Sequence, residues 1–187
     1  MKTQVLLRSL LWGLLVSGYP IMMPVQAEPS VQVAQSQWQP FSDSQGGFTV
    51  LMPVTPTPKK QTQESAIGSI DFYSFTASQE EGSITYLVSY NDFPSAVVEL
   101  PPEVLLDSLR SAFVADRNVR LVNEEEIRLG NYPGREFKIE IPGKTAVIHR
   151  AYLVGSRLYQ LVTETPLDRE QELSSDTEKF FSSFELE

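Results

Sequence analysis

The second half of this chain is punctuated by short turn signals that leave room for hairpins only. Groups rich in Gly, Pro and Asn stand at residues 130–134, 142–144 and 155–156, with β-rich stretches between them. Antiparallel strands can be joined by two or three residues, whereas parallel strands need a crossover of a dozen or more. The spacing therefore predicts four consecutive antiparallel strands from residue 119 onward, with no helix between them.

Charge pairing predicts the register around the turn at 142–144. A two-residue turn would place Arg135 opposite Arg150, and like charges directly opposed destabilise a strand pair. A three-residue turn instead places Glu136 opposite Arg150. Because a slip of one residue would also move every side chain to the wrong face, we expect the three-residue turn.

The last turn distributes side chains between two faces of the sheet. Gly155-Ser156 suits a two-residue type II′ turn, which opposes Tyr152 to Tyr159. One face then gathers arginine and tyrosine, residue types that are enriched where proteins bind each other. This candidate partner surface consists of Arg150, Tyr152, Arg157 and Tyr159. The competing interpretation is that a helix covers this face and that the tyrosines are packed beneath it.

Apolar and β-branched runs predict three strands before the meander. They lie at residues 48–52, 69–76 and 84–90, and the polar residues 78–82 suit a hairpin loop between the last two. The segment 53–67 holds three prolines, so we expect a loop there. The expected central sheet is mostly antiparallel and has about six or seven strands.

Two segments carry helical rather than strand periodicity. One opens at Pro101-Pro102, where proline in the first turn costs no hydrogen bond, and the other at Thr165-Pro166, where Asp168 indicates a capping-box variant. Apolar residues at helical spacing then mark one face of each. The stripes are Leu105, Leu106, Leu109, Ala112 and Phe113, and then Leu173, Thr177, Phe180, Phe181 and Phe184. The pattern predicts an α+β domain with two main helices.

The start of the chain has the pattern of a secretory signal peptide. Lys2 and Arg8 precede an apolar run at 10–16, and small residues that suit a signal peptidase follow, ending at Ala27. We therefore expect residues 1–27 to be a signal peptide, 28–40 a flexible leader and 41–187 a single domain. An uncleaved membrane anchor is the alternative, although the apolar stretch is interrupted at 18–20 and falls short of the roughly 20 residues that span a bilayer.

Composition excludes several classes of function. The chain has no cysteine, which removes disulfides, thiolate metal sites, a cysteine nucleophile and a lipoprotein anchor. Its formal charge of −9 should repel phosphate backbones and anionic lipid surfaces, so we expect neither nucleic-acid binding nor membrane insertion of the mature protein.

No motif for catalysis, a cofactor or a metal ion is present in the sequence. His149 is the only histidine, and the predicted register places it on the apolar face beside Phe137, so we interpret it as a core residue. The acidic run 124–126 lies in a predicted strand, where consecutive side chains point to alternate faces, and we interpret it as a solvated charge run that protects an edge. We therefore expect no enzyme activity, no cofactor and no metal site. A metal-dependent hydrolase built from carboxylates finds no supporting motif.

Three short motifs occur in order along the chain. They are Gly47-Phe48-Thr49-Val50 followed by Pro53, then Gly155-Ser156-Arg157-Leu158-Tyr159, and the closing Phe181-Ser182-Ser183-Phe184. Together they resemble the PsbP family, lumenal proteins related to the extrinsic subunit of photosystem II. The resemblance covers residues 41–187 and implies an α/β/α sandwich in the periplasm or the thylakoid lumen. It departs from the family after the first strand's proline, where Val54 and Thr55 replace the usual tryptophan. No metal or chloride ligand set carries over.

Two functions follow as expectations. The first is an exported, non-catalytic accessory protein that docks on a membrane-protein complex through protein–protein contacts, with photosystem II as the assembly that the resemblance implies. The second is an extracytoplasmic module that binds a small ligand between the sheet and a helix, because apolar pockets with a few polar groups are the usual form of such sites. The aromatic residues expected to line this pocket are Phe72, Phe75, Tyr86 and Tyr90.

Overall fold

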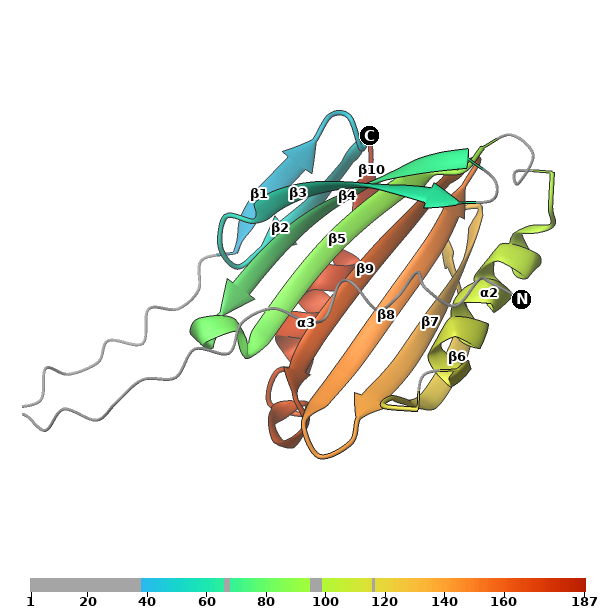
Figure 1. The fold of residues 1–187 in the computed structure, drawn as a ribbon. Helices are drawn as coiled ribbons and strands as arrows, with labels where there is room; N and C mark the ends of the chain where they lie inside the picture. Colours follow the sequence, from blue (N-terminus) through green and yellow to red (C-terminus); the bar gives the residue numbers. More distant parts are fainter. Residues whose placement is uncertain (1–37, 66–67, 95–98, 116) are drawn as a thin grey trace, which may run out of the picture. The chain divides into compact units, whose positions relative to one another are not determined.

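Seven strands that follow one another in the chain form a single antiparallel sheet (Figure 1). The computed structural model describes residues 38–65, 68–94, 99–115 and 117–187. The strand order is β3-β4-β5-β9-β8-β7-β6. The strands are β3 (Thr57–Ser65), β4 (Gly68–Gln79), β5 (Ile84–Asp92), β6 (Arg120–Leu129), β7 (Tyr132–Ile141), β8 (Thr145–Val154) and β9 (Arg157–Pro166). The expected signal peptide, residues 1–27, lies outside the described residues.

The predicted meander and its register are confirmed. Strands β6 to β9 pair antiparallel in succession, and Glu136 stands opposite Arg150, with 2.5 Å between Arg150 Nε and a Glu136 carboxylate oxygen. At the next turn Tyr152 stands opposite Tyr159, and Gly155 has a φ of 60°, the left-handed conformation that glycine adopts without strain. The two turns therefore define which side chains share a face.

The loop predicted over 53–67 is wrong, because most of it is β3. This strand pairs with β4 along its whole length and forms one edge of the sheet. An edge strand can hold Pro58, since one side of the strand needs no hydrogen-bond donor. Lys59 and Lys60 are exposed there, and lysine is a common guard of sheet edges. The prolines and charges that favoured a loop are thus features of an edge strand.

A second, smaller sheet contains the first predicted strand. Its order is β1-β2-β10, where β1 spans Gln39–Asp43, β2 Phe48–Met52 and β10 Glu185–Leu186. The run at 48–52 is therefore a strand as predicted, but it lies outside the central sheet. The expected leader 28–40 also overlaps β1 at its last two residues. Pairing of β10 with β2 joins the two ends of the described chain, a long-range contact that no local pattern signals.

The two helices lie on opposite faces of the large sheet (Figure 1). Helix α3 (Ser174–Ser182) and the small sheet cover the face that carries Tyr86 and Tyr159, which we call the α3 face. Helix α2 (Pro102–Ala115) covers part of the other face, the α2 face, where Leu106 packs with Leu153 and Leu158. The result is an α+β sandwich with a seven-stranded antiparallel sheet and two helices, as predicted.

The start predicted for the last helix is wrong, although its apolar stripe is confirmed. Thr165 is buried in β9, opposite Ala146, and the backbone N–H of Leu167 donates to the carbonyl of Lys144. These contacts keep the strand going past the predicted cap. A short 3₁₀ turn, η2 (Leu167–Arg169), follows, and α3 begins only at Ser174. The stripe residues Leu173, Thr177, Phe180, Phe181 and Phe184 are all buried.

Aromatic rings fill the core between the large sheet and its cover of α3 and small sheet. The ring of Phe48, fully buried in β2, lies 5.5 Å from that of Phe184 and 6.3 Å from that of Tyr159. The cover is also joined by a hydrogen bond, in which the N–H of Leu51 donates to Ser183 Oγ at 2.9 Å. Phe184 therefore connects the end of α3 to both sheets.

We predict that Phe184→Ala lowers the free energy of unfolding by about 3–5 kcal/mol, because it removes a buried ring and leaves a cavity. Val114→Ala is the matched control, since Val114 is 59% exposed on α2, and we expect a change within about 0.5 kcal/mol. Urea unfolding of both variants measures the difference. Equal effects would show that the C-terminal segment does not stabilise the core.

Candidate functional site

The residues of the expected partner surface are placed on the α3 face, but its tyrosines are not at the surface. Tyr152 and Tyr159 are 6% and 4% exposed, because Phe184 and the small sheet cover them. Their rings pack against Phe184, at centroid distances of 6.5 and 5.5 Å. The alternative interpretation of a covered sheet face therefore describes both tyrosines, and the prediction that they are exposed is wrong.

Arg150 and Arg157, the two arginines of the expected partner surface, lie at different places. Arg150 packs beneath α3, where its guanidinium lies 4.4 Å from the centre of the Phe181 ring and pairs with Glu136. Arg157 lies at the start of β9, near the turn between β1 and β2. The register prediction was correct, and the same register separates the two arginines along the strand pair, because Arg150 stands opposite Leu161 and Arg157 opposite Val154.

Arg157 holds the β1–β2 turn against the large sheet. Its Nε and Nη2 donate to the two oxygens of Asp92 at 2.7 and 2.8 Å, and its Nη1 donates to the carbonyls of Gln45 and Gly46 at 2.9 and 3.0 Å. The guanidinium also lies 4.7 Å from the centre of the Tyr90 ring. Bidentate pairing of this kind restricts geometry, and hydrogen bonding to Asp92 raises the pKa of Arg157. One side chain thus joins a turn, a strand end and an aromatic ring.

The turn approaches the sheet closely enough to require glycine. A Cβ on Gly46 would lie 2.7 Å from ring carbons of both Phe48 and Tyr90. The Gly46 carbonyl accepts a hydrogen bond from the hydroxyl of Tyr159 at 2.5 Å, and the Gly46 N–H donates to Asp43 at 2.6 Å. The position of the turn is therefore defined by hydrogen bonds to two neighbouring strands.

Two adjoining hollows lie between this turn and the β3–β4 hairpin, and we call them together the turn groove. Their volumes are about 250 and 260 Å³, and Gln45 and Tyr73 line both. The Tyr73 ring stacks on Tyr90 at 4.9 Å, so the floor is aromatic. The remaining lining residues are Asp43, Pro58, Lys59, Lys60, Ser69, Asp71, Phe75 and Asp92.

The charges of the turn groove are balanced by local pairs. Lys60 pairs with Asp71 at 2.8 Å and lies 5.1 Å from the centre of the Tyr73 ring, and its hydrogen bond lowers the pKa of Asp71. The hydrogen bond from Arg157 likewise lowers the pKa of Asp92. Both carboxylates are therefore ionised at neutral pH and already paired. The arrangement suits recognition of polar and aromatic groups, and none of these carboxyls is poised as a general acid near pH 7.

The aromatic pocket expected between the sheet and a helix does not form. Phe72 stands opposite Asn91 on the α2 face, whereas Phe75, Tyr86 and Tyr90 lie on the α3 face. Tyr86 is fully buried against Phe180 of α3, at a centroid distance of 5.4 Å. Phe75 and Tyr90 line a hollow, but it lies beside the β1–β2 turn. Strand alternation separates Phe72 from Phe75, because their positions differ by an odd number.

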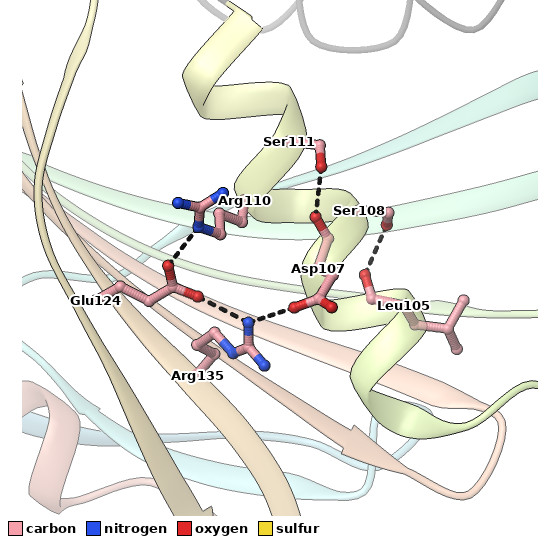
Figure 2. A network of polar contacts seen from close by, with 7 residues as sticks. All are labelled: Leu105, Asp107, Ser108, Arg110, Ser111, Glu124 and Arg135. Carbon is pink, nitrogen blue, oxygen red and sulfur yellow. Dashed lines mark hydrogen bonds and ion pairs between the residues drawn. The ribbon is translucent and has the colours of Figure 1, made fainter.

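His149 is a buried core residue on the α2 face, opposite Phe137, as predicted. Glu124, the first residue of the acidic run, instead pairs with Arg110 and Arg135 in a network that Figure 2 shows. Within the described residues, no group of three His, Asp or Glu is placed to hold a metal ion. The same part of the chain contains no helix with the length and apolarity needed to cross a membrane.

Sequence reasoning missed most of the turn groove. Gln45, Asp43 and Tyr73 carry no motif, and β3, which supplies one wall, was predicted as a loop. The available signal was the pair Gly46-Gly47 just before the apolar run at 48–52, which is typical of a turn that leads into a strand. Only the register between distant strands shows which residues meet that turn.

We predict that Tyr159→Phe lowers the free energy of unfolding by about 1 kcal/mol, because it removes the buried hydroxyl that donates a hydrogen bond to the Gly46 carbonyl. Tyr132→Phe removes the same atom from a side chain in a residue that is 41% exposed, and its effect should stay within about 0.5 kcal/mol. Chemical denaturation of the two variants provides the comparison. An equal loss in both would contradict a structural role for the Tyr159 hydroxyl.

Comparison with known proteins shows a likeness in structure alone. No family model matches the chain, and no curated protein matches it. The solution structure of cyanobacterial PsbP (CyanoP) from Synechocystis sp. PCC 6803 is similar at 16% identity and a TM-score of 0.54, over 88% of this chain and 100% of that one. LpqN from Mycobacterium tuberculosis, described as involved in cell envelope biogenesis, reaches 10% identity and a TM-score of 0.44, over 69% and 83% of the two chains. The first likeness shows that this chain has a PsbP-like fold.

Proposed function

We propose that this chain is an exported, non-catalytic accessory protein that docks on a membrane-protein assembly through the turn groove. The signal-peptide pattern at 1–27 supports an extracytoplasmic location in the periplasm or thylakoid lumen. The PsbP-like fold is consistent with such a setting but does not define a function, because one fold can host many. The observation that carries the proposal is a shallow groove with a floor of stacked tyrosines, beside a turn that Arg157 holds in place.

The exposed rim of the groove favours a protein segment over an enclosed small ligand. The two adjoining hollows together have about 510 Å³, within the roughly 300–1,000 Å³ of typical small-molecule pockets, so volume does not distinguish the two kinds of partner. Gln45 and Lys59 at its rim are exposed and Tyr73 is partly exposed, so a partner chain can contact the Tyr73 ring, which is stacked on the buried Tyr90. Aromatic anchors surrounded by a polar rim are the usual composition of a protein–protein contact.

The charges on the rim of the groove determine how strongly docking should depend on salt. The rim mixes Lys59 and Lys60 with the carboxylates of Asp71 and Asp92, so no single sign of charge dominates. Exposed pairs contribute little and are screened by salt, whereas contact with the ring floor is not. We therefore expect docking to weaken only moderately between low and high salt.

We predict that a large aromatic ring placed in the turn groove prevents docking. Gln45 lines both hollows, so Gln45→Trp should fill them and reduce the amount of bound assembly at least about tenfold. The measurement is co-isolation of the tagged, full-length chain from membranes of the source organism, with quantification of specific subunits. Lys144→Trp is the matched control, because it places the same ring on an exposed turn between β7 and β8.

The outcomes separate the alternatives. Recovery of photosystem II subunits with the wild type and Lys144→Trp, but not with Gln45→Trp, would support docking through the groove on the assembly that the PsbP resemblance implies. Recovery that Gln45→Trp leaves unchanged would exclude the groove. If no assembly is recovered, the accessory role is wrong, and a thermal-shift screen with metabolites and lipids then tests the small-ligand alternative at the same tyrosines.

A further inference from the structure

Three buried polar side chains on the α2 face have atoms without a hydrogen-bond partner. They are the side-chain amide of Asn91, Nε of Arg135 and Nε2 of His149, in residues that are 1%, 9% and 7% exposed. Buried polar atoms are usually hydrogen-bonded within the protein, because burial removes the water that would otherwise bind them. Covering this face therefore carries a free-energy penalty that uncovering it would remove.

Helix α2 covers this face through few apolar side chains. Only Leu106 and Phe113 of the helix are buried, the first against Ala151, Leu153 and Leu158 and the second against Phe137 and Ile139. The outward side of the helix exposes Val104 and Val114, which are 48% and 59% accessible. Leu105 and Leu109 of the helix are only partly buried against the same side chains.

A charged network holds α2 to the sheet margin. Nη1 of Arg135 lies 2.5 Å from Asp107 and 2.7 Å from Glu124, and Nε of Arg110 lies 2.7 Å from the other oxygen of Glu124 (Figure 2). Asp107 and Arg110 come from the helix, Glu124 from β6 and Arg135 from β7. The side chains of Asp107 and Arg110 are 60% and 50% exposed, so solvent screens much of their attraction.

His149 lies beneath the second half of α2. Its ring is 5.3 Å from that of Phe113 and 6.1 Å from that of Phe137, both in edge-on contact. Burial lowers the pKa of His149 to about 4, although Gln160 on β9 forms a hydrogen bond with it. The covered imidazole is therefore neutral, and its Nε2 has no hydrogen-bond partner.

The charged groups around His149 do not favour its protonation while α2 is in place. Arg135 on β7 and Glu164 on β9 occupy the diagonal positions on the same sheet face. Arg135 is a fixed cation, and burial raises the pKa of Glu164 towards the neutral acid. On α2, the charged groups that face the sheet are Asp107 and Arg110, which are engaged in the network with Arg135 and Glu124.

We propose that α2 is a releasable cover on the sheet and that protonation of His149 releases it. The charged network and the apolar side chains of Leu106 and Phe113 hold the cover, and the unpartnered atoms of Arg135 and His149 beneath it oppose it. Release gives Arg135 and His149 access to water while β5, β8 and β9 keep their ladder and the opposite face keeps its aromatic core.

The pH range follows from the two states of the imidazole. In the released state His149 is solvated and its pKa returns to about 6.5, whereas in the covered state it is about 4. Below pH 6.5 the released state binds the proton and the covered state does not, so release becomes more favourable as the pH falls towards 4. At pH 5 the population of the released state should be about 30-fold higher than at pH 7.5.

Hydrogen–deuterium exchange of the mature chain tests the proposal, with rates corrected for the intrinsic effect of pH. We expect amides of α2 to exchange about 30-fold faster at pH 5 than at pH 7.5, and amides of β5 and β9 to remain protected. His149→Phe keeps a ring between Phe113 and Phe137 but cannot titrate, so its α2 exchange should not respond to pH. His149→Gln serves the same purpose if the phenylalanine variant does not fold.

Two further variants test whether the pH response comes from His149 and not from the charged groups around it. Asp107→Asn weakens the charged network and should speed α2 exchange at both pH values, leaving the ratio between them near 30-fold. Glu164→Gln removes the neighbouring acid and should also leave the ratio unchanged. Equal acceleration in β5 and β9 would indicate global unfolding and overturn the proposal, as would a pH response that persists in both His149 variants or is absent from the wild type.

Discussion

The pairing of β8 with β9 is the constraint on which the rest of the structure depends. Opposing Tyr152 to Tyr159 gives one sheet face its aromatic side chains, and the same register gives the other face Leu153 and Leu158. Both faces are therefore apolar and both need a cover. The chain has no cysteine, so no disulfide adds to the stability that burial of these faces supplies. Placement of α3 with the small sheet on one side, and of α2 on the other, follows from this requirement.

The two covers differ in how they are attached, and the difference separates stability from function. On the α3 face, rings from both sheets and from Phe184 pack around Phe48, and Arg157 and Tyr159 bind the backbone of the β1–β2 turn. A rigid turn beside stacked tyrosines is a suitable docking surface, because little conformational entropy is lost on binding. On the α2 face, a short apolar contact lies over polar atoms that lack partners. Low local stability is expected there, and moving elements are generally drawn from such regions.

Local sequence patterns predicted the turns and helices that depend only on residues close together in the chain. The turns at 142–144 and 155–156, the helix after Pro101 and the stripe of α3 all follow from turn chemistry or periodicity, and the structure contains each of them. Errors arose where a distant contact overrides a local preference. β3 exists because β4 offers it a partner over nine residues, and Thr165 remains in a strand because Ala146 pairs with it.

The sequence alone determined the class of fold, the register of the meander and the exclusion of cysteine-based chemistry, since each depends on residue type and spacing. Tertiary structure decided which face of the sheet each helix covers, and this placement buried the tyrosines and moved the candidate site to the β1–β2 turn. The physical reason is that alternation assigns a side chain to a face but does not indicate what covers that face. The covers come from segments far away in the chain, such as Phe184 against Tyr152, and their positions are set by packing.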